Sequence, residues 1–380
     1  MKIANTRKIN ERIQQYIERE ELNALIGMNV GEPFSQNLKF ENPSLLDEFA
    51  RDFRADLEKE GIELSKDESI IASMLMTVLN EKMGGVSEFP KQVFFDIVFN
   101  GMVFHKGSFG TNEYLNNVIF EEEKVGRFTI KYNSYSKYEA FHYSIPIFSP
   151  NGYLIPLIGT FKYRFKYPCI EEDGVTWMSV TPNEILTMER PIEEATKRVL
   201  TLGCGMGYFA YMVSLKSDVE HVTIIEREQE VIDLFTEHIL PHFKDKEKIT
   251  IIKSDACEYM KNLKDGEFDY CFADLWLGNN DIKEYLKLKN ICAGFEKMKV
   301  SYWIEGSLVY SLMQYVHLII TGQQAINMKT EPMVPSEMSD DDREIINYLE
   351  GILDDEEIKS VEDVDRYMDY NTIIKLIETR

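Results

Sequence analysis

The strongest constraint on the fold is a strand–helix–strand rhythm that begins after Pro191. Short apolar runs alternate there with segments of helical periodicity. Such alternation predicts a parallel, doubly wound sheet, because each helix carries the chain back across the sheet. The expected strands are 198–202, 222–225, 249–252, 268–273 and 300–304, and the expected helices are 207–215, 229–239, 257–263 and a segment that ends at 320. We therefore predict an α/β fold with a Rossmann-like sheet in residues 176–325.

The rest of the chain divides into three regions of different pattern. Residues 1–100 have helical patterns, and Ser65-Lys-Asp-Glu68 has the spacing of a capping box. Residues 101–175 contain short apolar runs separated by prolines and glycines, which predicts a small antiparallel β module. Within it, Phe161–Tyr167 alternates with period two, as a half-buried strand does. Residues 326–380 have the pattern of an acidic helical tail.

Composition limits the classes of function. The net charge of −23, from 42 basic and 65 acidic residues, disfavours general binding to nucleic acids or anionic membranes. The five cysteines are an odd number without a Cys-x-x-Cys pair, which favours a reducing compartment and argues against a structural zinc. The longest apolar stretch, Leu308–Ile320, is too short and too polar to span a bilayer. The N-terminus lacks the apolar core of a secretory signal, so we expect a cytoplasmic protein.

The most informative segment is the glycine turn Gly203-Cys-Gly205-Met-Gly207, which follows the first expected strand and opens a helix. Glycines in this position let the backbone approach a ligand closely and leave helix N–H groups available to it. A dinucleotide fingerprint would place its third glycine at position 208, which is Tyr208. A P-loop Gly-Lys-Ser/Thr is also missing. The turn therefore fits neither a nicotinamide cofactor nor a nucleoside triphosphate well.

Three acidic residues follow the next three strands of the predicted sheet. Glu226 ends the second strand, and a carboxylate there can accept hydrogen bonds from ribose hydroxyls. Asp255 ends the third strand, where it can accept from an adenine amino group, and Asp274 ends the fourth. The carboxyl ends of parallel strands are where such sheets bind ligands, so we expect the three acids to share one site with the glycine turn.

In this order, the glycine turn, Glu226, Asp255-Ala256 and Asp274 resemble the motifs of class I S-adenosylmethionine-dependent methyltransferases. The resemblance covers roughly residues 176–322 and is strongest to the spermidine-synthase-like branch, through Val219–Glu226 and through Asn183-Glu184 to Glu189. It implies that the turn holds the methionine part of the cofactor, Glu226 its ribose and Asp255 its adenine, with Asp274 near the sulfonium and the acceptor. The cofactor-binding set that it implies is Gly203, Cys204, Gly205, Gly207, Glu226, Arg227, Asp255, Ala256 and Asp274.

Several positions depart from the aminopropyltransferases of that branch. Those enzymes carry an acid between the last glycines, where this chain has Met206, and a second acid after the fourth strand, where it has Leu277. Thr187 and Met188 replace a Tyr-His pair. A diamine needs carboxylates for both ammonium groups, so these losses count against aminopropyl transfer. The usual final antiparallel hairpin is not evident either, and is expected to be cryptic around 318–328 or missing.

Methyl transfer from a sulfonium is an in-line displacement, so positioning supplies most of the catalysis. We expect Asp274 to be the base or the residue that positions the acceptor. Trp276 is a candidate wall of the acceptor pocket, Tyr208 a candidate to close over the cofactor, and Glu184 and Glu189 candidates to line the cleft. Four of these residues have a structural alternative: a cap of the following turn for Asp274, packed core for Trp276 and a solvated helix face for the two glutamates.

The first hypothesis is a methyltransferase that uses S-adenosylmethionine, yields S-adenosylhomocysteine and acts on a small molecule. The alternatives are a spermidine-synthase-like aminopropyltransferase that uses decarboxylated S-adenosylmethionine and a non-catalytic cofactor-binding or interaction module. No nucleic-acid or membrane partner is favoured, and a homodimer is compatible with the resemblance. No metal is expected, because Pro241 should end the helix between His238 and His242 and no third ligand accompanies them.

Overall fold

The computed structural model describes residues 1–40, 42–85, 89–278, 281–330 and 338–378. It has a mixed α/β fold centred on a five-stranded parallel sheet with the strand order β13-β12-β11-β14-β15. The strands are β11 (Lys197–Leu202), β12 (Val219–Glu226), β13 (Ile249–Lys253), β14 (Tyr270–Ala273) and β15 (Lys299–Tyr302). The order reverses between β11 and β14, so the ends of these two strands form the crevice in which doubly wound sheets bind ligands.

Alternate residues of the sheet strands enter two different hydrophobic cores. Leu200 and Leu202 of β11 pack in one core, whereas Val199 packs in the other. This alternation follows from the period of two in a strand, and it buries both faces of the sheet under helices. The flanking helices are α7 (Pro182–Glu194), α8 (Tyr208–Ser214), α9 (Gln229–Leu234), α10 (Ala256–Asn262), α11 (Ile282–Cys292) and α12 (Glu305–Met328). The predicted parallel sheet is thus confirmed, strand by strand.

Residues 318–328 do not form the final antiparallel hairpin that is usual in the resembling family. Residues 318–328 belong to α12, which runs without interruption from Glu305 to Met328. Its apolar residues, among them Leu312, Val316 and Ile320, recur at helical spacing and are buried on one face. In the part of the chain that the structure describes, the sheet therefore ends at β15.

The N-terminal region is helical, as its patterns predict. Ser65 and Glu68 form the expected capping box, in which the Ser65 Oγ accepts from the Glu68 backbone N–H at 3.1 Å. This cap satisfies N–H groups that would otherwise lack partners at the start of α4. The helices are α1 (Arg7–Ile26), α2 (Glu32–Ser35), α3 (Pro43–Lys59), α4 (Lys66–Met83) and α5 (Lys91–Asn100), with a π-helical turn, η1 (Gly27–Gly31), between the first two.

The following region forms small sheets, but the predicted antiparallel module needs two corrections. First, Met102–Phe104 (β2) pairs in parallel with Ile158–Phe161 (β8). Second, Phe161–Tyr167 is not one strand, because β8 ends at Phe161, the chain bends at 162–164, and β9 begins at Phe165. Phe161, Phe165 and Tyr167 are nevertheless all buried, so the period-two pattern reports burial across a bend. The sheets are β10-β9-β4-β3, β2-β8-β5 and β6-β7, built from β2 (Met102–Phe104), β3 (Glu123–Val125), β4 (Phe128–Tyr135), β5 (Ala140–His142), β6 (Ile147–Phe148), β7 (Leu154–Ile155), β8 (Ile158–Phe161), β9 (Phe165–Glu172) and β10 (Val175–Ser179), with the short helix α6 (Glu113–Asn117) before β3.

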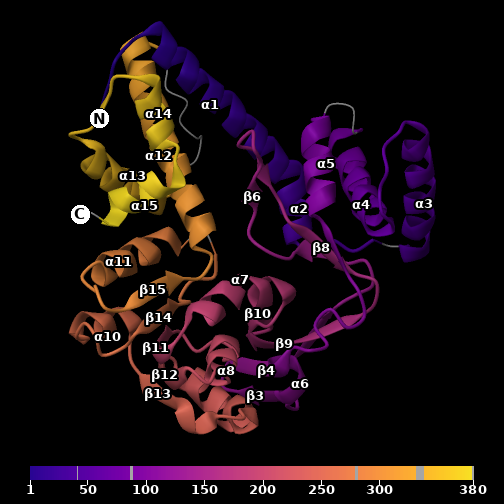
Figure 1. Cartoon of the computed structure of the whole chain (residues 1–380), viewed down its shortest axis with the longest axis vertical. Coiled ribbons are helices and arrows are strands. Elements are labelled where there is room, and N and C mark those ends of the chain that lie inside the picture. Colours follow the sequence, from indigo (N-terminus) through magenta and orange to yellow (C-terminus); the bar gives the residue numbers. More distant parts are fainter. Residues whose placement is uncertain (41, 86–88, 279–280, 331–337, 379–380) are drawn as a thin grey trace.

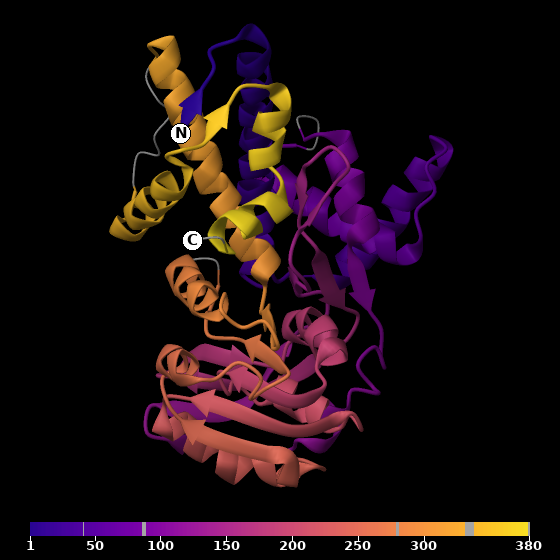
Figure 2. The ribbon, with the colours of Figure 1, turned by 60° about the vertical axis from the view of Figure 1, so that its left-hand side comes forward.

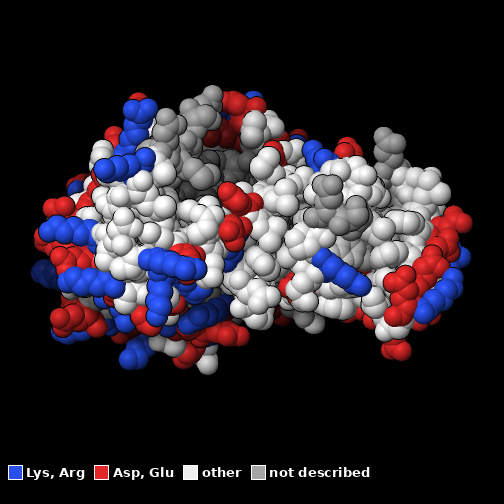
Figure 3. All heavy atoms as spheres, turned by 90° about the horizontal axis from the view of Figure 1, so that it is seen from above, with Lys and Arg blue, Asp and Glu red and all other residues white. Residues whose placement is uncertain are grey.

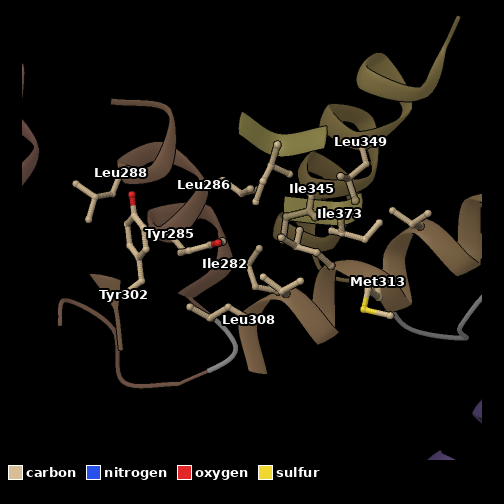
Figure 4. Packing of buried hydrophobic residues seen from close by; sticks show 14 of the residues in the cluster. Ile282, Tyr285, Leu286, Leu288, Tyr302, Leu308, Met313, Ile345, Leu349 and Ile373 are labelled. Atoms are coloured by element: carbon tan, nitrogen blue, oxygen red, sulfur yellow. The ribbon is translucent and has the colours of Figure 1, made fainter. Parts of the chain in front are cut away.

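The acidic C-terminal segment packs into the protein rather than forming a separate appendage. Its helices are α13 (Asp340–Leu353), α14 (Val361–Tyr367) and α15 (Tyr370–Glu378), and its strand β16 (Glu357–Ile358) pairs in parallel with β1 (Lys2–Ile3). The apolar faces of α13 and α15 bury Ile345, Leu349 and Ile373 against α11 and α12 (Figure 4). Figures 1 and 2 both show these yellow helices beside α12, above the parallel sheet.

A buried lysine ties the same helices together. Lys289 of α11 is 7% exposed, and its ammonium group lies 2.9 Å from Glu305 of α12 and 3.0 Å from Glu378 of α15. A charge in this position needs such partners, because burial without them would be costly. The ion pairs therefore fix the end of the chain against the sheet domain.

The surface is mixed in charge. On the face shown in Figure 3, lysines and arginines lie among aspartates and glutamates rather than in one basic patch. None of the helices in the described ranges combines the length and hydrophobicity needed to cross a membrane.

The packing of α15 generates a stability prediction. Ile373→Ala removes a fully buried side chain, so we expect it to lower the free energy of unfolding by about 2–4 kcal/mol. Asn371→Ala, on the exposed face of the same helix, should change it by no more than about 0.5 kcal/mol. Urea denaturation followed by tryptophan fluorescence measures both. Equal, small effects would show that the C-terminal helices do not contribute to the core.

Candidate functional site

The glycine turn lies between β11 and α8, and each of its glycines has a positive φ. Gly203 has φ +96°, and a Cβ there would lie 2.2 Å from the backbone oxygen of Asp274. A Cβ on Gly207, at φ +70°, would lie 2.3 Å from the ring of Phe235. A Cβ on Gly205, at φ +51°, would have no neighbouring atom within 4 Å. The outer glycines are thus required by packing, and the middle one leaves room for a ligand to approach.

Glu226 is buried at the end of β12, where its carboxylate closes the turn. Its Oε2 accepts from the Cys204 backbone N–H at 3.1 Å, and its Oε1 accepts from the N–H groups of Arg227 and Glu228 at 2.7 and 2.9 Å. A carboxylate offers about four lone-pair positions, so one place on Oε2 remains for an outside donor. The geometry is compatible with one ribose hydroxyl; a second would have to displace a backbone donor.

Asp255 stands at the end of β13 and caps α10. Its Oδ1 accepts from the Glu258 backbone N–H at 2.9 Å, while the side chain is exposed. The capping role accounts for one oxygen, and the second remains available to a ligand. Ala256 follows as a small buried residue.

Two carboxylates of this region, Asp274 and Glu184, have strongly raised pKa values. The Asp274 backbone N–H donates to the Leu202 carbonyl at 2.9 Å, which fixes the residue beside the glycine turn. Desolvation raises the Asp274 pKa to about 7, and its carboxylate has no hydrogen-bond partner among the described residues. Desolvation, together with the negative charge of Asp274, raises the pKa of Glu184 to about 8. Perturbed carboxylates of this kind mark functional sites.

Glu184 is held by its surroundings at the start of α7, which packs against α8 and lies next to β10 (Figure 1). Its carboxylate accepts from the Thr181 backbone N–H at 2.9 Å and from the Ser179 hydroxyl at 3.1 Å. Ser179 was missed in the sequence, although this residue lies only five positions before Glu184 and shortly before its capping box. The capping-box spacing of Thr181-Pro-Asn-Glu184 is a sequence signal that predicts Glu184 in the first turn of a helix.

The other cofactor candidates flank the turn. The Cys204 side chain is buried, and burial raises its thiol pKa well above the usual value, which fits a small residue in the turn rather than a reactive nucleophile. Arg227 contributes its backbone N–H to Glu226, while its side chain is 72% exposed and lies 3.5 Å from Glu228. The structure therefore brings the turn, Glu226 and Asp274 together, with Asp255 at the neighbouring strand end.

The three remaining candidates are Trp276 for the wall of the acceptor pocket, Tyr208 for the cover of the cofactor and Glu189 for the lining of the cleft. Trp276 is packed in the core rather than on a pocket wall: its indole N–H donates to the Trp303 carbonyl at 2.8 Å, and its ring meets Tyr285 edge-on. The Tyr208 ring is buried against that of Tyr114. Its hydroxyl accepts from the Asn112 amide at 3.0 Å, so the side chain is directed toward α6. Glu189 is exposed on α7, which agrees with the alternative of a solvated helix face.

The two main cavities lie away from the candidate site residues. A cavity of about 1140 Å³ lies between α1 and α12 and another of about 530 Å³ between α12 and α13, and none of the site residues lines either. The candidate site instead lies at the carboxyl ends of the parallel strands, where doubly wound sheets bind their ligands. Within the described ranges, no group of three or more His, Cys, Asp or Glu side chains can hold a metal ion. The prediction that Pro241 ends the helix between His238 and His242 is wrong in detail, because the π-helical turn Phe235–Ile239 continues directly into the 3₁₀ turn Leu240–His242, which contains the proline.

Comparison with known proteins supports a family likeness for this part of the chain. Residues 183–290, less than a third of the chain, match the family model of the spermine/spermidine synthase domain. The chain therefore contains a spermidine synthase-like domain. A search of curated proteins gives no match.

Solved structures resemble the chain only weakly. A spermidine synthase in complex with the transition-state analogue AdoDATO is 19% identical, with a TM-score of 0.29 over 37% of this chain and 54% of that one. The spermidine synthase from Thermotoga maritima is 18% identical (TM-score 0.28; 40% and 59% covered), and a putative O-methyltransferase from Klebsiella pneumoniae is 14% identical (TM-score 0.26; 45% and 66% covered). The chain thus spans between half and two thirds of the length of these proteins.

The turn geometry predicts different costs for two glycines. Gly203→Ala combines a left-handed backbone with a clash against the Asp274 carbonyl, so we expect it to lower the free energy of unfolding by about 2–4 kcal/mol. Gly205→Ala meets no neighbour and should cost about 1–2 kcal/mol from backbone strain alone. Chemical denaturation of both variants measures this. The opposite ranking would contradict the close contact between the turn and β14.

The carboxylate pair predicts a pH dependence of stability. The usual pKa values of 3.8 and 4.5 rise to about 7 for Asp274 and about 8 for Glu184, so the folded state binds more protons than the unfolded state between these limits. The free energy of unfolding should therefore fall as the pH rises from about 5 to about 8, by about 1–3 kcal/mol after allowance for solvent screening.

The comparison of variants isolates this effect. Glu184→Gln with Asp274→Asn should flatten the fall, and the exposed Glu63→Gln should leave it unchanged. Thermal denaturation across the pH range is the measurement. A fall of the same size in the double variant would assign it to other groups.

Proposed function

We propose that this protein transfers an aminopropyl group from decarboxylated S-adenosylmethionine to an amine acceptor. The observation that carries the proposal is the Asp274 carboxylate, which follows β14 at the sheet crevice without a hydrogen-bond partner among the described residues and whose charge contributes to the raised pKa of Glu184. An ammonium or amine is the group that such a pair would hold. The family-model match, which spans both carboxylates and the glycine turn, also supports this alternative over the first hypothesis of methyl transfer.

The residues present fit a sulfonium nucleoside. Open space over Gly205 admits a close ligand, Glu226 keeps one acceptor position for a ribose hydroxyl, and Asp255 keeps one oxygen. The sulfonium supplies an electrophilic carbon when it is bound. Nothing in this arrangement requires a covalent bond to the protein, so alignment of donor and acceptor is the main contribution of the turn.

Asp274 and Glu184 would act on the acceptor nitrogen. An amine attacks only through its free electron pair, so its ammonium form must first lose a proton to a carboxylate. The nitrogen then forms the new C–N bond while the C–S bond breaks, and that electron pair stays on sulfur as a neutral thioether. Carboxyl pKa values of about 7 and 8 suit this exchange near neutral pH.

Methyl transfer is the second candidate, and a specific observation favours it. Met206 and Leu277 stand where the aminopropyltransferases carry further acids, and Leu277 is 74% exposed. A methyl acceptor needs only one nitrogen or oxygen at Asp274. The same carboxylate would then position that atom for attack on the methyl carbon.

Product analysis with both donors tests the proposal. We expect mass spectrometry to detect aminopropyl transfer to an amine from the decarboxylated donor, and less or no methyl transfer from the intact one. Asp274→Asn should lower kcat/KM by about 100-fold or more, because general-base catalysis typically contributes that much. Glu63→Gln is the matched control and should keep the full rate. Methyl transfer alone would replace the proposal with the second candidate, and full activity in Asp274→Asn would remove the assigned base.

A further inference from the structure

The turn of the hairpin β3–β4 places an arginine against the loop that holds Glu226. The guanidinium group of Arg127, in this turn, lies 3.1 Å from the Glu228 carboxylate and 3.2 Å from that of Glu230. Its Nε donates to the carboxylate of Glu172 in β9 at 2.5 Å. One side chain of the β module therefore contacts two acidic residues that follow shortly after β12.

The Arg127 side chain is fixed in this position by its surroundings. Its guanidinium group lies over the ring of Phe128, 4.6 Å from the centroid, and that buried ring packs on Trp177. A Cβ on Gly126, at φ +60°, would lie 2.3 Å from Oε1 of Glu230, so the hairpin turn meets α9 directly. Single exposed ion pairs contribute little, but a planar guanidinium group between three carboxylates and a ring forms a network of fixed geometry.

Glu228 connects this network to the carboxylate that we assign to the ribose. The Glu228 backbone N–H donates to Oε1 of Glu226 at 2.9 Å, and the Arg227 N–H donates to the same oxygen at 2.7 Å. The other oxygen, Oε2, accepts from the Cys204 N–H of the glycine turn at 3.1 Å. The orientation of the Glu226 carboxylate therefore depends on the backbone of the two residues that follow it.

This loop carries three negative charges close together, at Glu226, Glu228 and Glu230. Their repulsion disfavours one fixed conformation, and Arg127 offsets it by contacting two of the three carboxylates.

We propose that Arg127 is a positioning residue for the sulfonium donor: it holds Glu228, whose N–H keeps the Glu226 carboxylate oriented for a ribose hydroxyl. A carboxylate that is already ordered binds its ligand more tightly, because binding then carries no ordering cost. The β module thus controls the affinity for the donor through one side chain. The inference rests on the proposed function, because it takes a sulfonium nucleoside as the ligand of Glu226.

Calorimetric titration of the full-length protein with decarboxylated S-adenosylmethionine, and with the intact form, tests this role. We expect Arg127→Gln to weaken donor binding about fivefold, the size of effect that a fixed network of surface ion pairs supports. The sign is diagnostic, because the donor is a cation and the loss of a positive charge by itself would strengthen its binding. The kcat at saturating donor should stay unchanged, because Arg127 acts on donor binding and not on the transfer step.

A double-mutant cycle tests the route through Glu228. Glu228→Gln should weaken donor binding to the same extent, and the double variant Arg127→Gln/Glu228→Gln should bind no more weakly than either single variant, because all three lose the same contact. The double variant also keeps the net charge of the wild-type chain. Arg198→Gln is the matched control and should keep the full affinity: the Arg198 side chain is 44% exposed, against 41% for Arg127, and it pairs with Asp269 at the amino end of the parallel sheet.

The outcomes separate the inference from the proposed function. Unchanged or tighter donor binding in Arg127→Gln, additive losses in the double variant, or a wild-type chain that binds neither donor would overturn the inference. Donor binding that depends on Arg127 without any aminopropyl transfer would instead overturn the proposed function and leave the positioning role standing. Calorimetry also reports the number of sites, so a partly unfolded variant would show fewer sites and not a weaker affinity.

Discussion

The close contact between the glycine turn and the end of β14 is the constraint on which the site depends. Gly203 has no Cβ, so its Cα side can lie against the backbone oxygen of Asp274. The Asp274 N–H in turn donates to the carbonyl of Leu202, the last residue of β11. Any larger residue at position 203 would push β11 and β14 apart at their carboxyl ends. The strand order reverses between these two strands, so this one contact defines the width of the crevice.

Burial of two carboxylates at this crevice opposes folding. The chain already carries a net charge of −23, and neither Asp274 nor Glu184 has a lysine or arginine among its described partners. The cost is limited because the Thr181 N–H and the Ser179 hydroxyl hold Glu184. Such unfavourable electrostatics persist where they serve a ligand, since a bound cation would supply the missing charge. By contrast Lys289, buried elsewhere, has both of its counter-ions in place.

The parts outside the parallel sheet have two separate roles in this fold. The C-terminal helices, α1 and α12 complete one hydrophobic core, and their contribution is structural. The antiparallel strands lie on the other side, where β10 ends at Ser179 shortly before α7. The β module thus supplies the Ser179 hydroxyl that holds the Glu184 carboxylate.

The sequence by itself determined the parallel sheet, the glycine turn and the strand-end acids. These features are local: a strand, a turn and a helix follow one another within about thirty residues, and parallel strands place their carboxyl ends at one edge. Only the tertiary structure decided that Trp276 lies in the core, where its indole N–H donates to the Trp303 carbonyl, and that residues 318–328 belong to α12 instead of a cryptic final hairpin. Those outcomes depend on packing between segments far apart in the chain. No local pattern encodes such contacts, because the same apolar or hydroxyl residue suits a core, a helix face or a site equally well until its neighbours are known.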